Sequence, residues 1–362
     1  MPVSFGVITY NTMMSVPVPI RFNGINQRKR KLGPCLYTHV KPTAFDVICF
    51  QELVFGSKQV LGSMVHHPYH SSTFRSSLLG PKIRLWPSGL YMASKYPIIK
   101  EHSYVFTGRT YHVEAVVAKG AVYCCINHPL LGQVHIVNTH LNAWTTGKAH
   151  EARVGQVGQI SRWIQSLKIP PHEPLVICGD WNVDFYECRD HMLTFCDILK
   201  GTLVLPETVQ FSLDGQTNSL VGLDDPSEYR TWKEQHGCYE DVLSSSVGRC
   251  MCCPRQLLDG FVIIQKPNKI YHTNVQVIQN KSMSAYPIHF DLSTTRMTRD
   301  VSDHYPSILT FRMEPAEECH KPIIPVVDHA VVHDGQWECL TLICVTLTST
   351  ILYLSLVSLF RL

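Results

Sequence analysis

An acidic and an amide side chain, two residues apart, follow a short apolar run in the middle of the chain. Asp180 and Asn182 come directly after Leu175-Val-Ile-Cys-Gly179. A run of this length that ends at glycine is typical of a buried strand that stops at a turn, and side chains two apart along a strand point the same way. A carboxylate and an amide directed at one point suit a hard divalent cation beside a phosphate. The same residues are also common turn formers, so this stretch alone leaves both interpretations open.

Similar polar residues recur where other predicted strands begin or end. These are Asn11, Glu52, His140, Asp259 and the pair Asp303-His304. Each of them alone is more often a cap or turn residue than a catalyst. Together they supply what metal-assisted phosphodiester hydrolysis requires: carboxylates for Mg²⁺, an imidazole for the proton, and amides and a second imidazole for the phosphate.

The elements that must position these residues alternate loosely between strands and helices. Strands are predicted at Ser4–Tyr10, Val47–Gln51, Leu90–Ser94, Val116–Ile126, Val134–Thr139, Leu175–Gly179, Leu258–Ile264, Val275–Ile278 and Ser307–Phe311. Helices are predicted after Glu52, as far as Met64, and from about Ala149 to Leu167, where apolar residues recur at helical spacing. Several predicted strands follow one another without a helix, which favours mixed sheets over a purely parallel one.

The composition is that of a globular protein with ample core. The chain has 362 residues, of which 45% are hydrophobic and 17% charged, and its net charge is only +3. Such a weak charge gives no indication of a nucleic-acid surface, and no nucleic-acid partner is expected. The first ten residues resemble a strand rather than a signal peptide. The 14 cysteines are therefore expected to be mostly reduced.

The C-terminal end differs in composition from the rest. Residues 340–360 contain no charged side chain, and their number matches the roughly 20 residues that a helix needs to cross a bilayer. A buried terminal helix is the alternative. The sequence thus predicts a catalytic domain at 1–313, a tether at 314–338 and a C-terminal transmembrane segment at 339–362. The catalytic domain is expected in the cytosol, attached to a membrane.

Further segments stand out. The stretch Arg21–Lys31 is rich in Arg and Lys, and we expect a solvated loop there, with attraction to an anionic membrane surface or a nuclear signal as alternatives. Cys238 and Cys250-Met-Cys-Cys253 are expected to be plain thiols or a disulfide rather than a zinc site. A membrane-dipping loop is predicted around Tyr286-Pro-Ile-His-Phe290 because aromatic and apolar residues alternate there.

The order of the polar motifs resembles that of the endonuclease/exonuclease/phosphatase superfamily. The motifs are Asn11, Gln51-Glu52, Asn138-Thr-His140, Gly179-Asp-x-Asn182, Leu258-Asp259 and Ser302-Asp-His304, and the resemblance covers about Ser4 to Phe311. Within it the chain most resembles the neutral, magnesium-dependent sphingomyelinases. That likeness rests on the stretches 138–143, 118–121, 88–98 and 179–183. It implies a deoxyribonuclease-like, four-layer α/β sandwich, with two mixed sheets face to face and helices outside.

The resemblance also implies roles for the motif residues. Glu52 would be the principal Mg²⁺ ligand with Asn11 near it, while Asp180 and Asn182 would hold the other side of the site and the attacking water; Mn²⁺ is also possible. His304 would be the general base, with Asp259 as its orienting carboxylate. The remaining implied roles are a metal or supporting group for Asp303, and phosphate binding or protonation of the departing alkoxide for His140. One departure is Gly260, where an aromatic residue usually follows Leu-Asp, and this is expected to loosen the Asp259–His304 contact.

Substrate contacts follow from the chemistry of a choline phosphodiester. A quaternary ammonium is held by aromatic faces, and the aromatic residues beside the motifs are Phe55, Tyr91, Trp144, Trp181 and Tyr305. Of these, Tyr91 and Trp144 are predicted to bind substrate, together with Lys119. The sequence thus predicts a membrane-associated phosphodiesterase that hydrolyses sphingomyelin, or a related choline phospholipid in a bilayer, to ceramide and phosphocholine. The alternatives are a nuclease or phosphoinositide phosphatase of the same superfamily, and a catalytically inactive lipid-binding protein.

Overall fold

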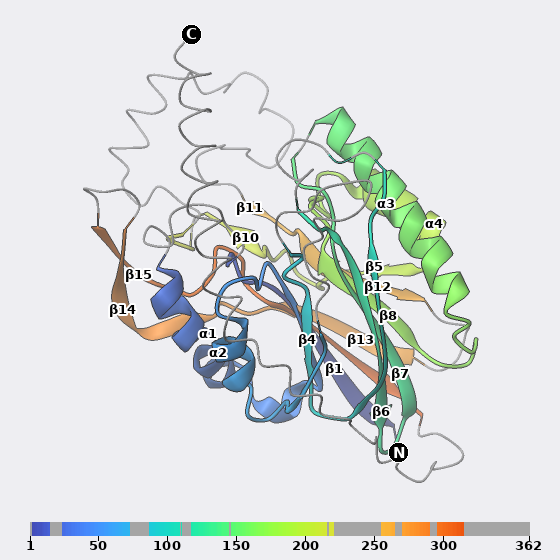
Figure 1. Cartoon of the computed structure of the whole chain (residues 1–362), viewed down its shortest axis with the longest axis horizontal. Helices are drawn as coiled ribbons and strands as arrows, with labels where there is room; N and C mark the ends of the chain where they lie inside the picture. The colour runs from blue at the N-terminus through green and yellow to red at the C-terminus, as the bar shows by residue number, and fades with distance from the viewer. Residues whose placement is uncertain are drawn as a thin grey trace, which may run out of the picture.

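Two six-stranded sheets pack face to face, and helices lie on their outer sides (Figure 1). The computed structural model describes residues 2–14, 24–72, 87–108, 110, 117–144, 146–215, 217–220, 255–264, 270–289 and 295–314.

The first sheet is built around β1, the N-terminal strand. Its order is β13 (Ile270–Val277), β16 (Ser307–Met313), β1 (Val3–Asn11), β2 (Val47–Gln51), β4 (Tyr91–Ser94) and β3 (Tyr69–His70). β1 runs parallel to β2 and antiparallel to β16. The ends of β1 and β2 therefore lie side by side, next to the beginning of β16.

The second sheet has the same mixed character. Its order is β5 (Ile98–Val105), β6 (Gly120–His128), β7 (Gly132–His140), β8 (Leu175–Asp180), β12 (Asp259–Ile264) and β9 (Thr202–Val204). β7 and β8 are parallel, so that His140 lies opposite Asp180, and antiparallel β12 begins with Asp259 opposite the same Asp180. Here too, the ends of two strands and the beginning of a third meet at one place.

Helices form the outer layers. Packed against the first sheet are α1 (Ile25–His39), a 3₁₀ turn (Pro42–Ala44) and α2 (Ser57–Gly62), whereas α3 (Gly147–Ser166) and α4 (Arg189–Leu199) cover the second. An apolar core between the sheets contains Phe5, Met92, Ile136, Val176 and Phe261, all with no exposed surface. The predicted four-layer sandwich with mixed sheets is confirmed. Its two short outlying sheets pair β10 (Leu213–Asp214) with β11 (Arg255–Gln256), and β14 (Lys281–His289) with β15 (Thr295–Asp300).

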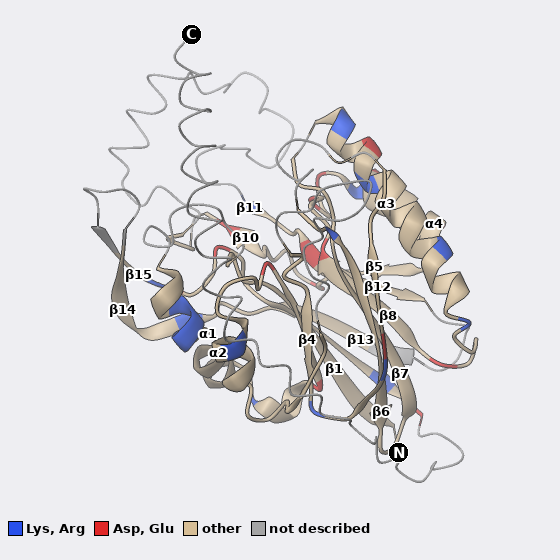
Figure 2. Ribbon diagram, in the orientation of Figure 1, with Lys and Arg blue, Asp and Glu red and all other residues tan. Residues whose placement is uncertain are grey.

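The expected solvated loop at Arg21–Lys31 is wrong from residue 25 onward, while residues 21–23 lie outside the described residues. Helix α1 begins at Ile25 and buries Ile25, Arg28 and Leu32. These side chains recur every three or four residues, so they share one helix face. The cationic residues between them obscure that apolar spacing in the sequence. Lys and Arg of this helix, and of α2 and α3, lie on the outer layers (Figure 2).

The predicted membrane-dipping loop around residues 286–290 is instead part of β14. Tyr286 and Ile288 are 4% and 1% exposed and form a small core with Cys35 of α1 and Val301. Phe290 lies outside the described residues. The alternation of apolar and polar residues arises because one face of this strand packs on α1, so Ile288 is a core residue and the prediction was wrong.

The predicted C-terminal membrane span is not supported. Among the residues that the structure describes, none of the helices combines the length and the apolar character needed to cross a bilayer. The segment 340–360 lies outside the described residues, as do residues 315–338 of the tether and the cysteines at 238 and 250–253. In the described part of the chain, seven free cysteines are found, at positions 35, 49, 124, 125, 178, 188 and 196.

Candidate active site

Glu52 is held in an unusual backbone conformation at the end of β2. Its φ of 57° lies in the left-handed region, which side chains other than glycine rarely adopt. The N–H of Leu53 donates to the carbonyl of Gly89 at 2.9 Å. Gly89 itself has φ +65°, and an added Cβ there would lie 2.7 Å from the Leu53 nitrogen. The Ser88-Gly89 motif thus supports the turn that presents Glu52, and only glycine fits this close approach.

Asn11, at the end of β1, links two carboxylates that come from different sheets. Its Nδ2 donates to Asp180 Oδ2 at 2.9 Å and to Glu52 Oε1 at 3.3 Å. Its Oδ1 accepts the backbone N–H of Met13 at 3.0 Å. Asn11 therefore bridges Glu52 and Asp180 in this structure, and its role as a metal ligand stays a prediction.

His140 adjoins the same two carboxylates. Its Nε2 lies 3.5 Å from Asp180 Oδ2 and 4.0 Å from Glu52 Oε1. Burial lowers the pKa of His140 well below its ordinary value, and the nearby Lys119 and His304 lower it further. His140 is therefore neutral around pH 7.

Lys119 and Asn182 share a partner near His140. Lys119 Nζ donates to the Leu141 carbonyl at 2.6 Å, and Asn182 Nδ2 donates to the same carbonyl at 2.9 Å. Asn182 also has a left-handed backbone, with φ 51°, and its N–H donates to Asp180 Oδ1 at 2.9 Å. In this arrangement both residues position the segment that follows His140.

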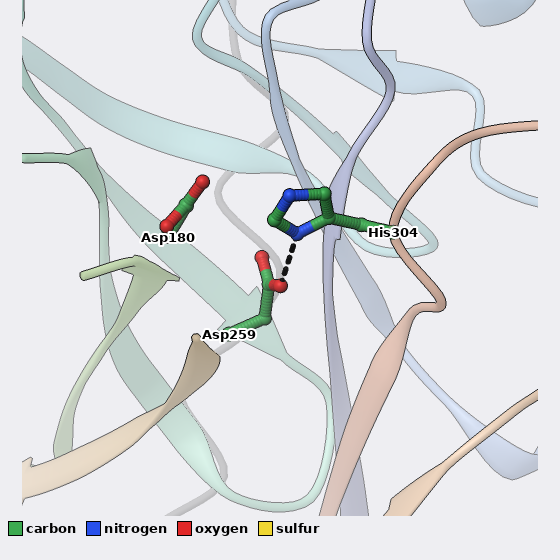
Figure 3. Close-up of side chains that lie close together, drawn as sticks. All are labelled: Asp180, Asp259 and His304. Atoms are coloured by element: carbon green, nitrogen blue, oxygen red, sulfur yellow. Dashed lines mark hydrogen bonds and ion pairs between the residues drawn. The ribbon is translucent and has the colours of Figure 1, made fainter. Parts of the chain in front are cut away.

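Asp259 and His304 form a buried pair. His304 Nδ1 lies 2.6 Å from Asp259 Oδ2, and Figure 3 shows both side chains gathered with the carboxylate of Asp180. Burial would lower the pKa of His304, but Asp259, Asp303 and Asp180 together raise it well above its ordinary value. Asp259 is placed by Ser212, whose Oγ accepts the N–H groups of Leu258 and Asp259 at 3.0 and 3.2 Å.

The departure at Gly260 does not loosen this pair. A Cβ at position 260 would lie 2.3 Å from Cε2 of Phe185, so the Phe185 ring fills the space beside the strand. The Asp259–His304 distance of 2.6 Å is that of a short, charge-assisted hydrogen bond. The expectation of a loosened contact is therefore wrong.

The site fits a hard divalent cation. Ligand atoms of Asp180, Asp259 and His304 lie within 4.8 Å of one another. Burial and the neighbouring Asp259 raise the pKa of Asp180 to about 7, against smaller opposing effects from His304, Asn11 and Lys119. Asp259 Oδ1 is buried and has no hydrogen-bond partner among the described residues. Buried carboxylates this close need an added positive charge, and carboxylate oxygens suit Mg²⁺ or Mn²⁺.

The other predicted site residues lie around this centre. Asp303 is half-buried, and its Oδ1 accepts a hydrogen bond from Ser302 Oγ at 3.2 Å. Trp144 is 52% exposed, whereas Tyr91 is partly buried against the core under α1 and α2. Of the remaining aromatic candidates, Trp181 and Tyr305 are 0% and 2% exposed and belong to the interior.

Some residues at the site have no role that the sequence indicated. Gln51 Nε2 donates to Asn138 Oδ1 at 2.6 Å, which joins β2 of the first sheet to β7 of the second. Gln51 and Asn138 belong to the Gln51-Glu52 and Asn138-Thr-His140 motifs and are fully buried, but nothing in the sequence indicated that they join the two sheets. A third residue without a predicted role is Arg28 of α1, which we expected to lie in a solvated loop.

The chain is similar to known proteins over part of its length. No protein-family model matches the chain. It is 31% identical to sphingomyelinase C of Leptospira interrogans over 215 residues, which covers 55% of this chain and 37% of the relative. It is 24% identical to an inositol phosphosphingolipids phospholipase C of Schizosaccharomyces pombe over 209 residues, which covers 52% and 47%. The matches thus span less than half the length of either curated relative.

The fold is shared with solved structures over most of the chain. The beta toxin of Staphylococcus aureus, in a crystal structure with bound magnesium ions, superposes with a TM-score of 0.66 at 21% identity, covering 86% of this chain and 100% of the toxin chain. Members of the endonuclease/exonuclease/phosphatase family share the fold as well. The chain therefore has the endonuclease/exonuclease/phosphatase fold. Its sequence is similar to those of a sphingomyelinase and a sphingolipid phospholipase, in line with the resemblance that its motifs indicated.

Proposed function

We propose that this protein is a metal-dependent phosphodiesterase acting on sphingolipids, and more specifically a sphingomyelinase that releases ceramide and phosphocholine. The observation that carries the proposal is the meeting of Glu52 and Asp180 with the Asp259–His304 pair at one end of two packed sheets. Both curated relatives are, by their names, enzymes that act on sphingolipids. That shared substrate class supports a sphingolipid substrate here.

The proposed mechanism assigns charge stabilisation to the carboxylates. Glu52 and Asp180 would hold a divalent cation, with Asn11 and Asn182 beside them. A bound cation would supply positive charge. This would offset the negative charge that builds on the phosphoryl oxygens during attack by water. Asp303 is within reach of the same region as a supporting carboxylate, since its own partner Ser302 also bonds the carbonyl of Asn11 at 2.8 Å.

The proton movements fall to the two histidines. Asp259 orients His304 through Nδ1. In its deprotonated form, His304 presents Nε2 to the attacking water and accepts a proton from it. His140 is neutral because burial disfavours its cation, so it can donate a hydrogen bond to the phosphate. The same Nε2–H could donate a hydrogen bond to the departing ceramide oxygen, while a bound cation would offset the negative charge that builds there.

The proposed contact for the choline group is an exposed aromatic residue near the site. Trp144 has a half-exposed ring a few residues after His140, as a cation–π contact to a quaternary ammonium requires. Lys119 is 4% exposed and bonds the Leu141 carbonyl, which favours a supporting role over a direct phosphate contact. Tyr91 stays a predicted substrate contact, although it is less exposed than Trp144 because it packs against the core.

The deciding experiment is the release of phosphocholine from sphingomyelin vesicles by the purified full chain. Mg²⁺ or Mn²⁺ after chelation should restore activity, and His304→Ala should show none. Parallel reactions use an inositol phosphosphingolipid, a phosphoinositide and DNA. Hydrolysis of DNA or of the phosphoinositide without hydrolysis of either sphingolipid would overturn the proposal. Turnover of the inositol phosphosphingolipid alone would retain the sphingolipid class and change the headgroup.

A further inference from the structure

Arg28 is a fully buried cation in the first turns of α1. Its side chain has no exposed surface, which is rare for arginine unless every donor is paired. Its Nε donates to the Val301 carbonyl at 3.0 Å, and Nη1 and Nη2 donate to the Met13 carbonyl at 3.1 and 2.9 Å. Nη2 also donates to the carbonyl of Thr12. One guanidinium thus binds three backbone carbonyls from two distant segments.

Those two segments carry residues of the candidate site. Thr12 and Met13 directly follow Asn11, which bridges Glu52 and Asp180. Val301 directly precedes Ser302-Asp303-His304. The Ser302 hydroxyl provides a second connection, because it donates to the Asn11 carbonyl at 2.8 Å. Arg28 therefore joins the loop after β1 to the loop before β16.

The charge of Arg28 faces the same region. Asp303 and Glu52 interact with it electrostatically, as do the hydroxyls of Tyr10 and Tyr286. Its guanidinium nitrogens are used on carbonyls, so Arg28 is not placed to touch a phosphate.

We propose that Arg28 is a positioning residue for the proposed phosphodiesterase site, on which this inference rests. Its fork-shaped guanidinium fixes the spacing between the Asn11–Met13 loop and the 301–304 loop. It thereby fixes the spacing between the Asn11-bridged carboxylates and the Asp259–His304 pair. A lysine keeps the charge but places a single nitrogen where three act, so it cannot bond carbonyls on both loops in the same geometry.

The test uses Arg28→Lys with Arg30→Lys as its matched control. Arg30 lies on the same helix and is exposed. Calorimetric titration of the metal-free full chain with Mn²⁺ measures metal affinity independently of activity. Arg28→Lys should weaken Mn²⁺ binding by about 10-fold or more, the loss typical when groups that support metal ligands are changed. Its kcat on sphingomyelin should fall comparably with KM unchanged, and Arg30→Lys should match wild type in every measurement.

A purely structural role gives a different result. It would lower the unfolding temperature while the folded fraction binds Mn²⁺ as wild type does, and that outcome overturns the proposal. Ser302→Ala provides a second variant that cuts the other link between the loops and leaves Arg28 in place. It should weaken Mn²⁺ binding in the same direction, and wild-type affinity in a folded Ser302→Ala protein would equally refute the proposal. If wild type hydrolyses no sphingolipid, the proposed function fails, yet the Mn²⁺ titrations still decide the role of Arg28.

Discussion

Replacing Asp259 by Asn should separate proton transfer from metal binding. Asp259 accepts from His304 Nδ1 at 2.6 Å, so in the neutral imidazole the acceptor nitrogen is Nε2. An Asn amide at this place donates to Nδ1 instead. It would therefore hold the proton on Nε2, where His304 can no longer act as a base. The fold is expected to tolerate the change, because the two side chains have the same shape.

The size of the effect follows from what general-base catalysis contributes. That contribution is typically 10²- to 10⁴-fold, or about 3 to 5 kcal/mol of transition-state stabilisation. We expect kcat of Asp259→Asn to fall within this range. Metal affinity, in contrast, should increase near pH 6. Asp259 is the neighbour that raises the pKa of Asp180, so its loss makes the Asp180 carboxylate easier to ionise and to offer to a cation.

The assay compares kcat for phosphocholine release with Mn²⁺ affinity from calorimetry, both at pH 6 and at pH 8. Asp197→Asn is the matched control, since Asp197 is exposed on α4. Activity above about a tenth of wild type would refute the assigned orientation of His304 by Asp259. A parallel loss of metal affinity and activity would show instead that Asp259 is itself a metal ligand.

Four further outcomes are expected. Glu52→Gln should raise the Mg²⁺ concentration needed for half-maximal activity and be partly restored by excess Mg²⁺, whereas His304→Ala should not be restored; equal behaviour of the two variants would contradict their separate roles. Because the pKa of Asp180 is about 7 without metal, its proton competes with the cation, and Mn²⁺ affinity should rise between pH 6 and pH 8; a flat profile would count against Asp180 as a ligand. The same raised pKa favours the metal-free fold at low pH, so the unfolding temperature without metal should fall as pH rises through about 7, and added metal should reverse this fall. Ile288→Ser should lower the unfolding free energy by about 2 kcal/mol or more because Ile288 is buried, while Met283→Ser, at 82% exposed, should leave it unchanged; a stable Ile288→Ser protein that loses only vesicle binding would restore the interface interpretation.

The strands that carry the site were predictable because two signals coincide in each. An apolar run identifies the strand, and a polar residue at its end identifies the site, as with Asp180 at the end of β8 and His140 at the end of β7. The four-layer arrangement came from the resemblance, since periodicity alone does not tell which strands pair. The departure at Gly260 was misjudged because Phe185, which fills the space beside it, lies 75 residues earlier in the sequence, where no local pattern connects the two.

Helix α1 shows why the opposite error occurs with charged residues. Four cations in Arg28-Lys-Arg-Lys31 suggest solvent, yet the first of them is on the buried face with Ile25 and Leu32. Composition cannot distinguish the buried Arg28 from the cations that follow it. Burial of an arginine depends on carbonyls supplied by segments that here lie almost three hundred residues apart in sequence. The same limit applies to β14, whose buried Tyr286 and Ile288 pack on this helix.

The position of the site between two sheets explains why polar links set its geometry. The two carboxylates that Asn11 bridges come from different sheets, since Glu52 follows β2 of the first and Asp180 ends β8 of the second, and apolar packing between the sheets is non-directional. Directional contacts must therefore fix how the two carboxylates face each other. Asn11 does so by bonding both carboxylates. The Gln51–Asn138 pair does so by joining β2 to β7, with 2.6 Å between Gln51 Nε2 and Asn138 Oδ1. Because these amides are neutral, they align the sheets without adding charge beside a cation site.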